Sequence, residues 1–341
     1  MTLFTRDIGI DLGTANTLVA VKGKGIIISE PSVVAIDTYS NKILAVGKDA
    51  KDMIGKTPSN IKAIRPLREG VIADFNITQK MLEYFIKKAT KKTGFAFRTR
   101  VVVGVPSEVT EVEKRAVIEA ALSAGAKKAL LLEEPMAAAI GAGLDVSLPS
   151  GNMVVDIGGG TSEIAVISLG GIVTSRSVRI GGDDLDIAIE QYIKKKYSLS
   201  IGSRTSERIK INIGSSFETD NETMEITGRN LINGLPRTLN INSDEIREAL
   251  ELPVKSIIDG IKLTLEKTPP ELASDIMQKG IMLAGGGALL RGLDKLIGRE
   301  TGMPVFIGEN PLDCVVKGTE IAIEDYELLQ SVFISPKDLR K

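Results

Sequence analysis

Two stretches of the sequence each place an aspartate, glycine and a threonine at the end of an apolar run. Residues 155–161 read V-D-I-G-G-G-T, and residues 10–14 read I-D-L-G-T. Successive glycines let backbone N–H groups converge on an anion without a Cβ atom in the way, and the aspartate can hold a hydrated cation beside it. A tight β-hairpin whose glycines only supply positive φ is the alternative for a single copy. The second copy favours a phosphate-binding turn.

Two such turns, one at the head of each half of the chain, can face each other across a cleft and hold a polyphosphate. Gly55-Lys56-Thr57 matches the end of the P-loop motif, but position 50 is alanine where the motif requires its first glycine. We therefore expect an ordinary loop there and no P-loop. The phosphate charge then calls for Mg²⁺, which Asp11 and Asp156 are placed to hold through water.

Glu134 follows a short apolar strand and precedes Pro135. Reactive groups collect at such strand ends in α/β folds, and a carboxylate there can orient or deprotonate a water molecule. A glutamate in the first turn of a helix, with proline at the first helical position, is the other interpretation. Thr161 can assist the same water or only hydrogen-bond its own turn. The sequence by itself leaves both questions open.

A third glycine run, Gly285-Gly286-Gly287, lies between an apolar strand and a helix. It is a candidate for close backbone approach to a base or ribose, although glycine is also routine in such connections. Glu207, Arg208 and Lys210 lie on a short charged helix. The alternative interpretation of these residues is a solvent-exposed helix face with no ligand.

Composition narrows the class of protein. The 341 residues are 43% hydrophobic and 26% charged, which predicts a globular chain of two domains or lobes. A net charge of −1 argues against nucleic acid as the main partner, and the absence of histidine excludes Ser-His and Cys-His nucleophiles. The single cysteine, Cys314, fits a reducing cytosol, and no apolar run is long enough to span a membrane, so we expect a cytoplasmic protein.

The order of predicted elements is strands, helix, strand, helix, strand, helix, and it begins again at Met153. We expect two like halves, each a mixed sheet with helices, joined near residues 141–151. Predicted helices include one over 108–124 that Ser107 caps and that buries Val112, one over 244–267 that Pro253 kinks or divides, and one over 288–299.

The chain resembles the actin, Hsp70 and sugar-kinase ATPase superfamily, and within it the MreB/Mbl family of bacterial actins. Segments that match the family's signatures are 11–17, 134–141, 156–161 and 285–290. The resemblance implies an α/β, duplicated actin-like (ribonuclease H-like) ATPase fold with a nucleotide cleft between two lobes. It implies four parts: a lobe I core (1–30, 75–142 and 311–341) with a small subdomain (31–74), and a lobe II core (143–181 and 244–310) with a small subdomain (182–243).

The resemblance also assigns roles to residues. The ATP phosphates are expected on Gly13, Thr14, Ala15, Asn16, Gly158, Gly159 and Gly160, with Mg²⁺ held through water by Asp11 and Asp156. Adenosine is expected to contact Glu207, Arg208, Ile209, Lys210, Gly285, Gly286, Gly287, Ala288 and Leu289. Glu134 is implied to position the hydrolytic water, with Thr161 nearby.

The function that the resemblance implies is a cytoskeletal ATPase that forms membrane-associated homopolymer filaments and organises cell-wall synthesis to maintain rod shape. Its implied partners are further copies of itself, the cytoplasmic face of the membrane, and cell-wall elongation and rod-shape proteins. A sugar or acetate kinase would use the same cleft and stays an alternative. An Hsp70-like ATPase would need a substrate-binding domain after the ATPase, for which a chain ending at Lys341 leaves no room.

Some relatives bind membrane through an amphipathic helix before the first strand, and here nothing precedes that strand. Phe95 and Phe97, in the loop Gly94-Phe95-Ala96-Phe97 with basic flanks, are the expected substitute for peripheral attachment. A buried loop tip is the other interpretation of this segment.

Overall fold

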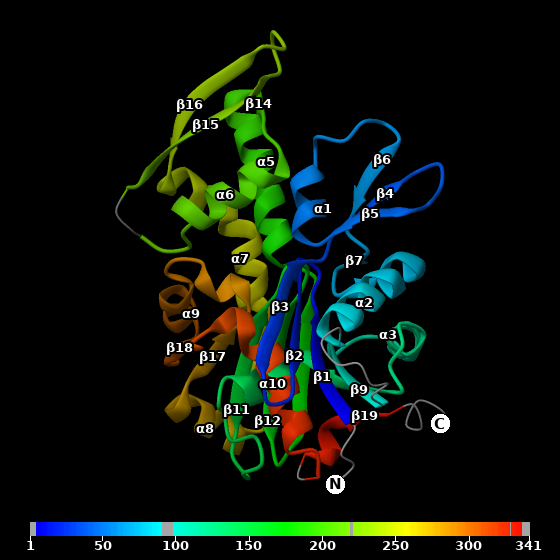
Figure 1. Cartoon of the computed structure of the whole chain (residues 1–341). Helices are drawn as coiled ribbons and strands as arrows, with labels where there is room; N and C mark the ends of the chain where they lie inside the picture. The colour runs from blue at the N-terminus through cyan, green and yellow to red at the C-terminus, as the bar shows by residue number, and fades with distance from the viewer. Residues whose placement is uncertain (1–4, 91–97, 219–220, 328, 336–341) are drawn as a thin grey trace.

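The two halves of the chain each form a mixed sheet, and the sheets lie side by side at the base of the molecule (Figure 1). In this computed structural model the described residues are 5–90, 98–218, 221–327 and 329–335. The first sheet has the order β19-β10-β9-β1-β2-β3 and the second the order β13-β12-β11-β17-β18. The strands of the first are β1 (Thr5–Leu12), β2 (Asn16–Val21), β3 (Gly25–Pro31), β9 (Arg98–Val105), β10 (Lys128–Glu133) and β19 (Phe333–Ile334). Those of the second are β11 (Asn152–Ile157), β12 (Ser162–Ser168), β13 (Gly171–Val178), β17 (Ile281–Ala284) and β18 (Val305–Ile307).

The two sheets repeat one topology. In the first, β1, β2 and β3 form an antiparallel meander, and β9 then pairs with β1 in parallel and β10 with β9 in parallel. In the second, β11, β12 and β13 form the meander, and β17 and β18 continue it in parallel. The expected duplication is therefore confirmed strand by strand.

Two helices pack between the sheets and join the halves. These are α4 (Glu134–Gly141) and α10 (Cys314–Glu324), and a Cβ atom on Gly141 or Gly318 would overlap a carbonyl oxygen of the facing helix. Glycine at these positions lets the two backbones touch. The apolar cluster around them draws Val102 from the first sheet and Val154 from the second, so one core spans both halves.

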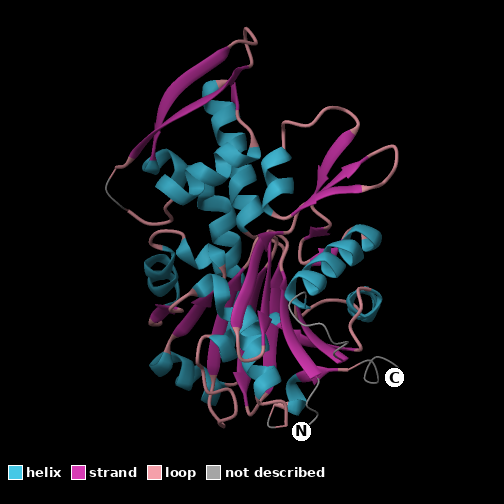
Figure 2. Ribbon diagram, in the orientation of Figure 1, coloured by secondary structure: helices cyan, strands magenta, loops and turns pink. Residues whose placement is uncertain are grey.

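A smaller group of elements rises above each sheet (Figures 1 and 2). Above the first are α1 (Lys48–Met53) and the sheet of β4 (Val34–Asp37), β5 (Ile43–Val46) and β6 (Ile61–Ile64), followed by β7 (Leu67–Arg68) and β8 (Val71–Ile72). Above the second are α5 (Gly182–Tyr197), α6 (Ser203–Ile213) and the sheet of β14 (Leu199–Ser200), β15 (Thr223–Asn230) and β16 (Pro236–Asn242). Gly55-Lys56-Thr57 follows α1 as a loop, as expected. The division into four parts stays a prediction.

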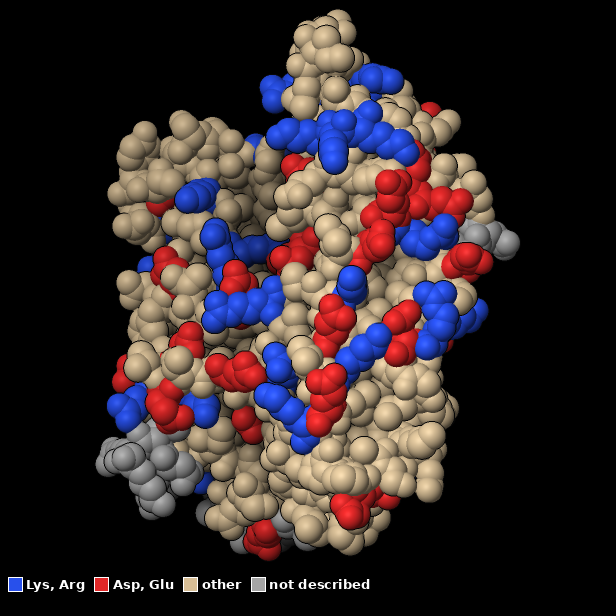
Figure 3. Space-filling model, turned by 180° about the vertical axis from the view of Figure 1, so that it is seen from behind, with Lys and Arg blue, Asp and Glu red and all other residues tan. Residues whose placement is uncertain are grey.

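The remaining helices cover the outer faces of the sheets. They are α2 (Phe75–Thr90), α3 (Glu111–Ser123), α7 (Ser243–Glu266), α8 (Pro270–Lys279) and α9 (Leu293–Thr301). Short 3₁₀ turns occur in the connections at η1 (Gly286–Leu289), η2 (Pro311–Asp313) and η3 (Gln330–Val332). On the face seen in Figure 3, basic and acidic side chains are interleaved over the middle of the molecule.

Three predicted helices differ from the structure. Helix α3 starts three residues late, because Thr110 and Glu113 form a capping box that the Ser107 prediction missed. The buried face then carries Val117 and Ile118, and Val112 is 76% exposed. Helix α7 runs unbroken through Pro253. The predicted helix over 288–299 is split into η1 and α9, because Gly292 adopts a left-handed φ of 71° between them.

Candidate functional site

A cleft of about 470 Å³ opens between the two halves, above the facing sheets. Its walls contain both Asp-Gly-Thr turns, one from the β1–β2 connection and one from the β11–β12 connection, together with the glycines of η1. The predicted residues that line it are Asp11, Gly13, Thr14, Ala15, Asn16, Glu134, Asp156, Gly158, Gly159, Gly160, Thr161, Glu207, Lys210, Gly285, Gly286, Gly287 and Leu289. One cavity thus gathers predicted residues from position 11 to position 289 of the chain.

The glycines of the second turn are needed for contact between the halves. The turn does join antiparallel strands, but positive φ is absent from Gly158, Gly159 and Gly160. A Cβ atom on Gly159 would lie 2.6 Å from the Cβ of Ala15, and one on Gly160 would lie 2.9 Å from the Thr14 Oγ1. The segment can therefore be both a hairpin connection and a ligand-binding turn. The close approach of the two turns explains the glycines better than a need for positive φ does.

A third turn, which the sequence analysis missed, closes over the other two. Glu69 and Gly70 join β7 to β8 with φ of 48° and 75°, as a two-residue type I′ hairpin requires. The Gly70 N–H donates to Thr14 Oγ1 at 3.0 Å. A Cβ on Gly70 would lie 2.6 Å from Cγ of Pro106 and 3.3 Å from Cγ2 of Thr161, so these residues pack together. The Glu-Gly dipeptide was the available signal.

Buried carboxyl groups gather at the floor of the cleft. Burial raises the pKa of Asp11 to about 7. Burial first, and then the charges of Glu163, Asp11 and Asp156, raise the pKa of Glu134 well above its usual value. Burial, with Asp11 and Glu163, does the same to the pKa of Asp156. This concentration of negative charge is unfavourable unless a cation is near.

One atom in this group is suited to a cation or its water shell. Among the described residues, Asp156 Oδ1 is buried without a hydrogen-bond partner. No group of three or more direct metal ligands occurs in the part of the chain that the structure describes. The unpartnered Oδ1 of Asp156 is a suitable acceptor for the water shell of Mg²⁺.

Among the described residues, four ion pairs connect the two halves. Lys51 Nζ lies 2.8 Å from Glu207 Oε1, and Arg65 Nη1 lies 2.6 Å from Asp183 Oδ1. The other two pairs are Arg204–Asp52 at 3.0 Å and Arg179–Glu69 at 3.3 Å. Each half-exposed pair contributes at most about 1 kcal/mol. All four hold the same two faces together, and Glu207 also lines the cleft.

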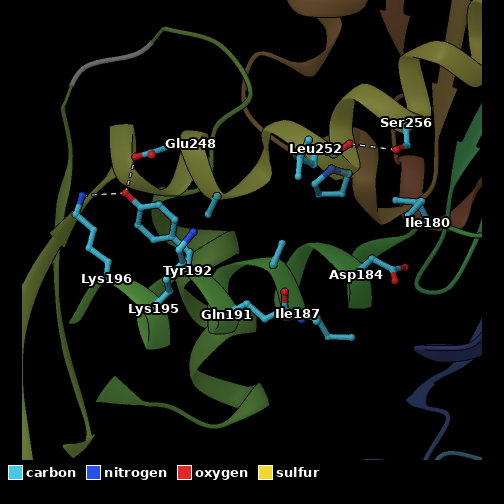
Figure 4. Close-up of a pocket in the computed structure, with 13 residues that line it drawn as sticks. Ile180, Asp184, Ile187, Gln191, Tyr192, Lys195, Lys196, Glu248, Leu252 and Ser256 are labelled. Carbon is cyan, nitrogen blue, oxygen red and sulfur yellow. Dashed lines mark hydrogen bonds between the residues drawn. The ribbon is translucent and has the colours of Figure 1, made fainter. Parts of the chain in front are cut away.

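A second cavity, of about 770 Å³, lies between α5 and α7 within the second half (Figure 4). Ile187, Leu252 and Pro253 form much of its wall, and Tyr192 donates to Glu248 while accepting from Lys196. None of the predicted site residues lines it. The second cavity is therefore separate from the cleft that gathers most of the predicted residues.

Comparison with known proteins identifies the family. A sequence model described as MreB/Mbl protein matches residues 5–331. The chain belongs to the MreB/Mbl family. The cell shape-determining protein Mbl of Bacillus cereus is 54% identical over 328 residues, which are 96% of this chain and 98% of the relative. The cell shape-determining protein MreB of Escherichia coli is 54% identical over 327 residues, 94% of each chain.

A solved structure of the family agrees with the fold. The crystal structure of MreB5 of Spiroplasma citri bound to ADP is 39% identical and has a TM-score of 0.91, covering 96% of this chain and 98% of that one. The expected duplicated actin-like fold is confirmed. As a member of the MreB/Mbl family, the chain has both lobes of that fold.

Three predicted nucleotide contacts of this family member do not line the cleft. The side chains of Ile209 and Ala288 are fully buried in the core of the second half, and Arg208 is exposed outside the cavity wall. Lys210 does line the wall, where its Nζ donates to the Gly182 carbonyl at 2.7 Å and pairs with Asp186 at 2.9 Å. Apolar residues that the prediction missed also line it, among them Leu185, Ile211 and Leu312.

The predicted membrane contacts, Phe95 and Phe97, lie outside the described residues. Within the described residues, helices of the length and apolar character needed to cross a bilayer are absent.

Proposed function

We propose that the chain is an ATP-binding and ATP-hydrolysing actin-like protein that polymerises into filaments, organises cell-wall synthesis and maintains rod shape. The observation that carries the proposal is the convergence of both Asp-Gly-Thr turns and of buried Glu134 on one cleft between the halves. Two relatives are named cell shape-determining proteins, and MreB5 was solved bound to ADP and to AMPPNP. Its proposed partners are other copies of itself and the cell-wall elongation and rod-shape proteins.

The phosphates of the nucleotide would be held by backbone donors. Turn residues 13–16 from the first half and 158–160 from the second face the cavity, and glycine keeps their N–H groups accessible. Glu207, Lys210 and Leu289 would surround the adenosine. Contacts from Arg208, Ile209 and Ala288 would have to come from their backbones, since their side chains are not in the cavity wall.

Asp11 and Asp156 would hold Mg²⁺ through water, and the bound ion would neutralise phosphate charge. The unpartnered Oδ1 of Asp156 supports this assignment. Glu134 begins α4 and lines the cleft, so it would orient the attacking water and accept its proton. Burial and the neighbouring carboxyl groups raise its pKa, so it holds a proton more strongly than an exposed glutamate does, as a general base must. The Thr161 hydroxyl lines the same wall and would assist in orienting the water.

Assembly tests the function as a whole. With ATP and Mg²⁺ we expect filaments by electron microscopy and a sedimenting fraction that grows with protein concentration. The physical reason is that a nucleotide held by both halves fixes the angle between them, and with it the surfaces that join protomers. A protein that stays monomeric with every nucleotide would contradict the proposal, and sugar-dependent release of ADP would favour the kinase alternative.

We also propose peripheral attachment to the cytoplasmic face of the membrane through Phe95 and Phe97. Two buried phenylalanines contribute about 3–6 kcal/mol before ordering costs, so a single protomer would bind marginally and a filament would bind by avidity. The double variant Phe95→Ala, Phe97→Ala is expected to lose co-sedimentation with anionic liposomes while it still assembles.

Tyr39→Ala provides a control for loss of an exposed aromatic residue elsewhere, because Tyr39 is 84% exposed. Liposome binding by the double phenylalanine variant at the wild-type level would refute the attachment site.

A further inference from the structure

Glu163 is a fully buried carboxyl group that the proposed mechanism does not use. It lies on β12 in the sequence S-E-I-A-V-I-S, a strand that is buried at every position. Burying a carboxylate costs several kcal/mol unless it is well paired. A neutral side chain would complete this strand at lower cost, so the carboxylate calls for an explanation.

The hydrogen bonds of Glu163 come from both halves of the molecule. Its Oε2 accepts from the N–H of Ser107 at 3.1 Å and from the Ser107 hydroxyl at 3.2 Å. Its Oε1 accepts from the Ser177 hydroxyl at 2.5 Å. Burial raises the pKa of Glu163, and hydrogen bonding from Thr161, two residues earlier in the chain, is among the smaller effects that lower it. Ser107 belongs to the first half and the other two partners belong to the second, so the carboxylate forms a buried link between the halves.

This link lies next to the proposed water-positioning group. Strands β9 and β10 run in parallel with Val105 opposite Glu133, so Ser107 and Glu134 leave the same edge of the first sheet. Burial first, and then the charge of Glu163, raise the pKa of Glu134. Pro106 and Thr161 both pack against Gly70 at the same place.

We infer that Glu163 is a positioning residue for ATP hydrolysis. It holds the Thr161 hydroxyl from one half and the Ser107 loop from the other. Thr161 therefore faces Glu134 only when the halves are closed. The inference rests on the proposed ATPase function. It makes hydrolysis depend on lobe closure through a buried contact, separate from the exposed ion pairs at the top of the cleft. Glu163 does not line the cleft, so it acts through its partners.

The test is Glu163→Gln in the full-length protein. Glutamine has one acceptor oxygen in place of two and carries no charge, so it cannot accept from both Ser107 and Ser177, and the bonds that remain are weaker, while the side-chain volume is kept. We expect kcat for ATP hydrolysis to fall about tenfold, which is about 1.4 kcal/mol, while the Kd for ADP and the Tm stay near wild type.

Two serine variants form a matched pair. Ser107→Ala removes a hydroxyl that bridges the halves, and Ser177→Ala removes one that acts within the second half. The positioning role predicts that Ser107→Ala lowers kcat more than Ser177→Ala does. This pair also keeps the inference testable if Glu163→Gln does not fold.

Four outcomes would overturn the inference. Turnover by Glu163→Gln at the wild-type rate would exclude a positioning role. A parallel loss of ADP affinity and Tm would assign Glu163 to structure alone, as would equal effects of the two serine variants. A wild-type protein that binds but never hydrolyses ATP would instead refute the proposed ATPase function, and the inference with it.

Discussion

Replacing Glu134 with alanine is expected to lower ATP hydrolysis by about 100-fold or more while ATP still binds. Glu134 is the first residue of α4, at the floor of the cleft, and it is only 8% exposed. The phosphate-binding turns are built from other residues, so binding should survive the loss of this carboxyl. Phosphate release measures the first quantity, and titration with a fluorescent ATP analogue measures the second.

Glu133→Ala is the matched control for Glu134. Glu133 is the preceding residue and its pKa is also raised by burial, but it is absent from the cleft wall. We expect this control to hydrolyse ATP at close to the wild-type rate. Unchanged phosphate release by Glu134→Ala would remove Glu134 from the mechanism, and loss of ATP binding by the same variant would give it a structural role.

The sequence offered two interpretations of Glu134 and two of the V-D-I-G-G-G-T segment, and the geometry shows why. Glu134 is the first helical residue, followed by Pro135, and it also lines the cleft. The V-D-I-G-G-G-T segment is a hairpin connection, and it also forms a wall of the cavity. In both cases the local role and the site role are compatible, so local pattern alone had no means of choosing between them.

The duplicated architecture was predictable because its signal is local. Each copy of the Asp-Gly-Thr turn follows an apolar strand, and the order of strands and helices repeats after it. The start of α3 was predictable as well, since Thr110 and Glu113 have the spacing of a capping box. Glu163 could also have been singled out from the sequence, because a charged residue inside an otherwise apolar strand is unusual.

The ion pairs across the cleft could not be predicted in the same way. Lys51 and Glu207 are separated by 156 positions, and each lies in a charged surface segment that resembles any other. The sequence around a surface charge does not indicate which distant residue it pairs with. Exposed ion pairs also contribute too little to the free energy of folding to constrain the sequence. The same limit applies to Arg208, Ile209 and Ala288, whose side-chain directions depend on how α6 and η1 pack rather than on their neighbours in sequence.

The closeness of the two turns leads to the second large effect, which we expect from Gly159→Ala. The added Cβ would lie 2.6 Å from the Cβ of Ala15 and 3.0 Å from its backbone N, and backbone atoms cannot rotate away. Overpacking of this kind costs about 1–3 kcal/mol, so ATP and ADP affinity should each fall about 10- to 100-fold as the halves are held apart. Isothermal titration calorimetry measures the affinities, and small-angle scattering measures whether nucleotide still changes the angle between the lobes.

Gly171→Ala is the matched control in the same sheet, because a Cβ there would meet only the Ser168 carbonyl oxygen at 3.8 Å. Its nucleotide affinity should stay at the wild-type value. The double variant Ala15→Gly, Gly159→Ala removes the Cβ–Cβ conflict and should recover part of the affinity, since the contact with the backbone N remains. If Gly159→Ala binds nucleotide as the wild type does, or if Ala15→Gly brings no recovery, the affinity does not depend on contact between these turns. The coupling of nucleotide binding to lobe closure would then have to act elsewhere, and the ion pairs between α1 and α6 are one connection to test next.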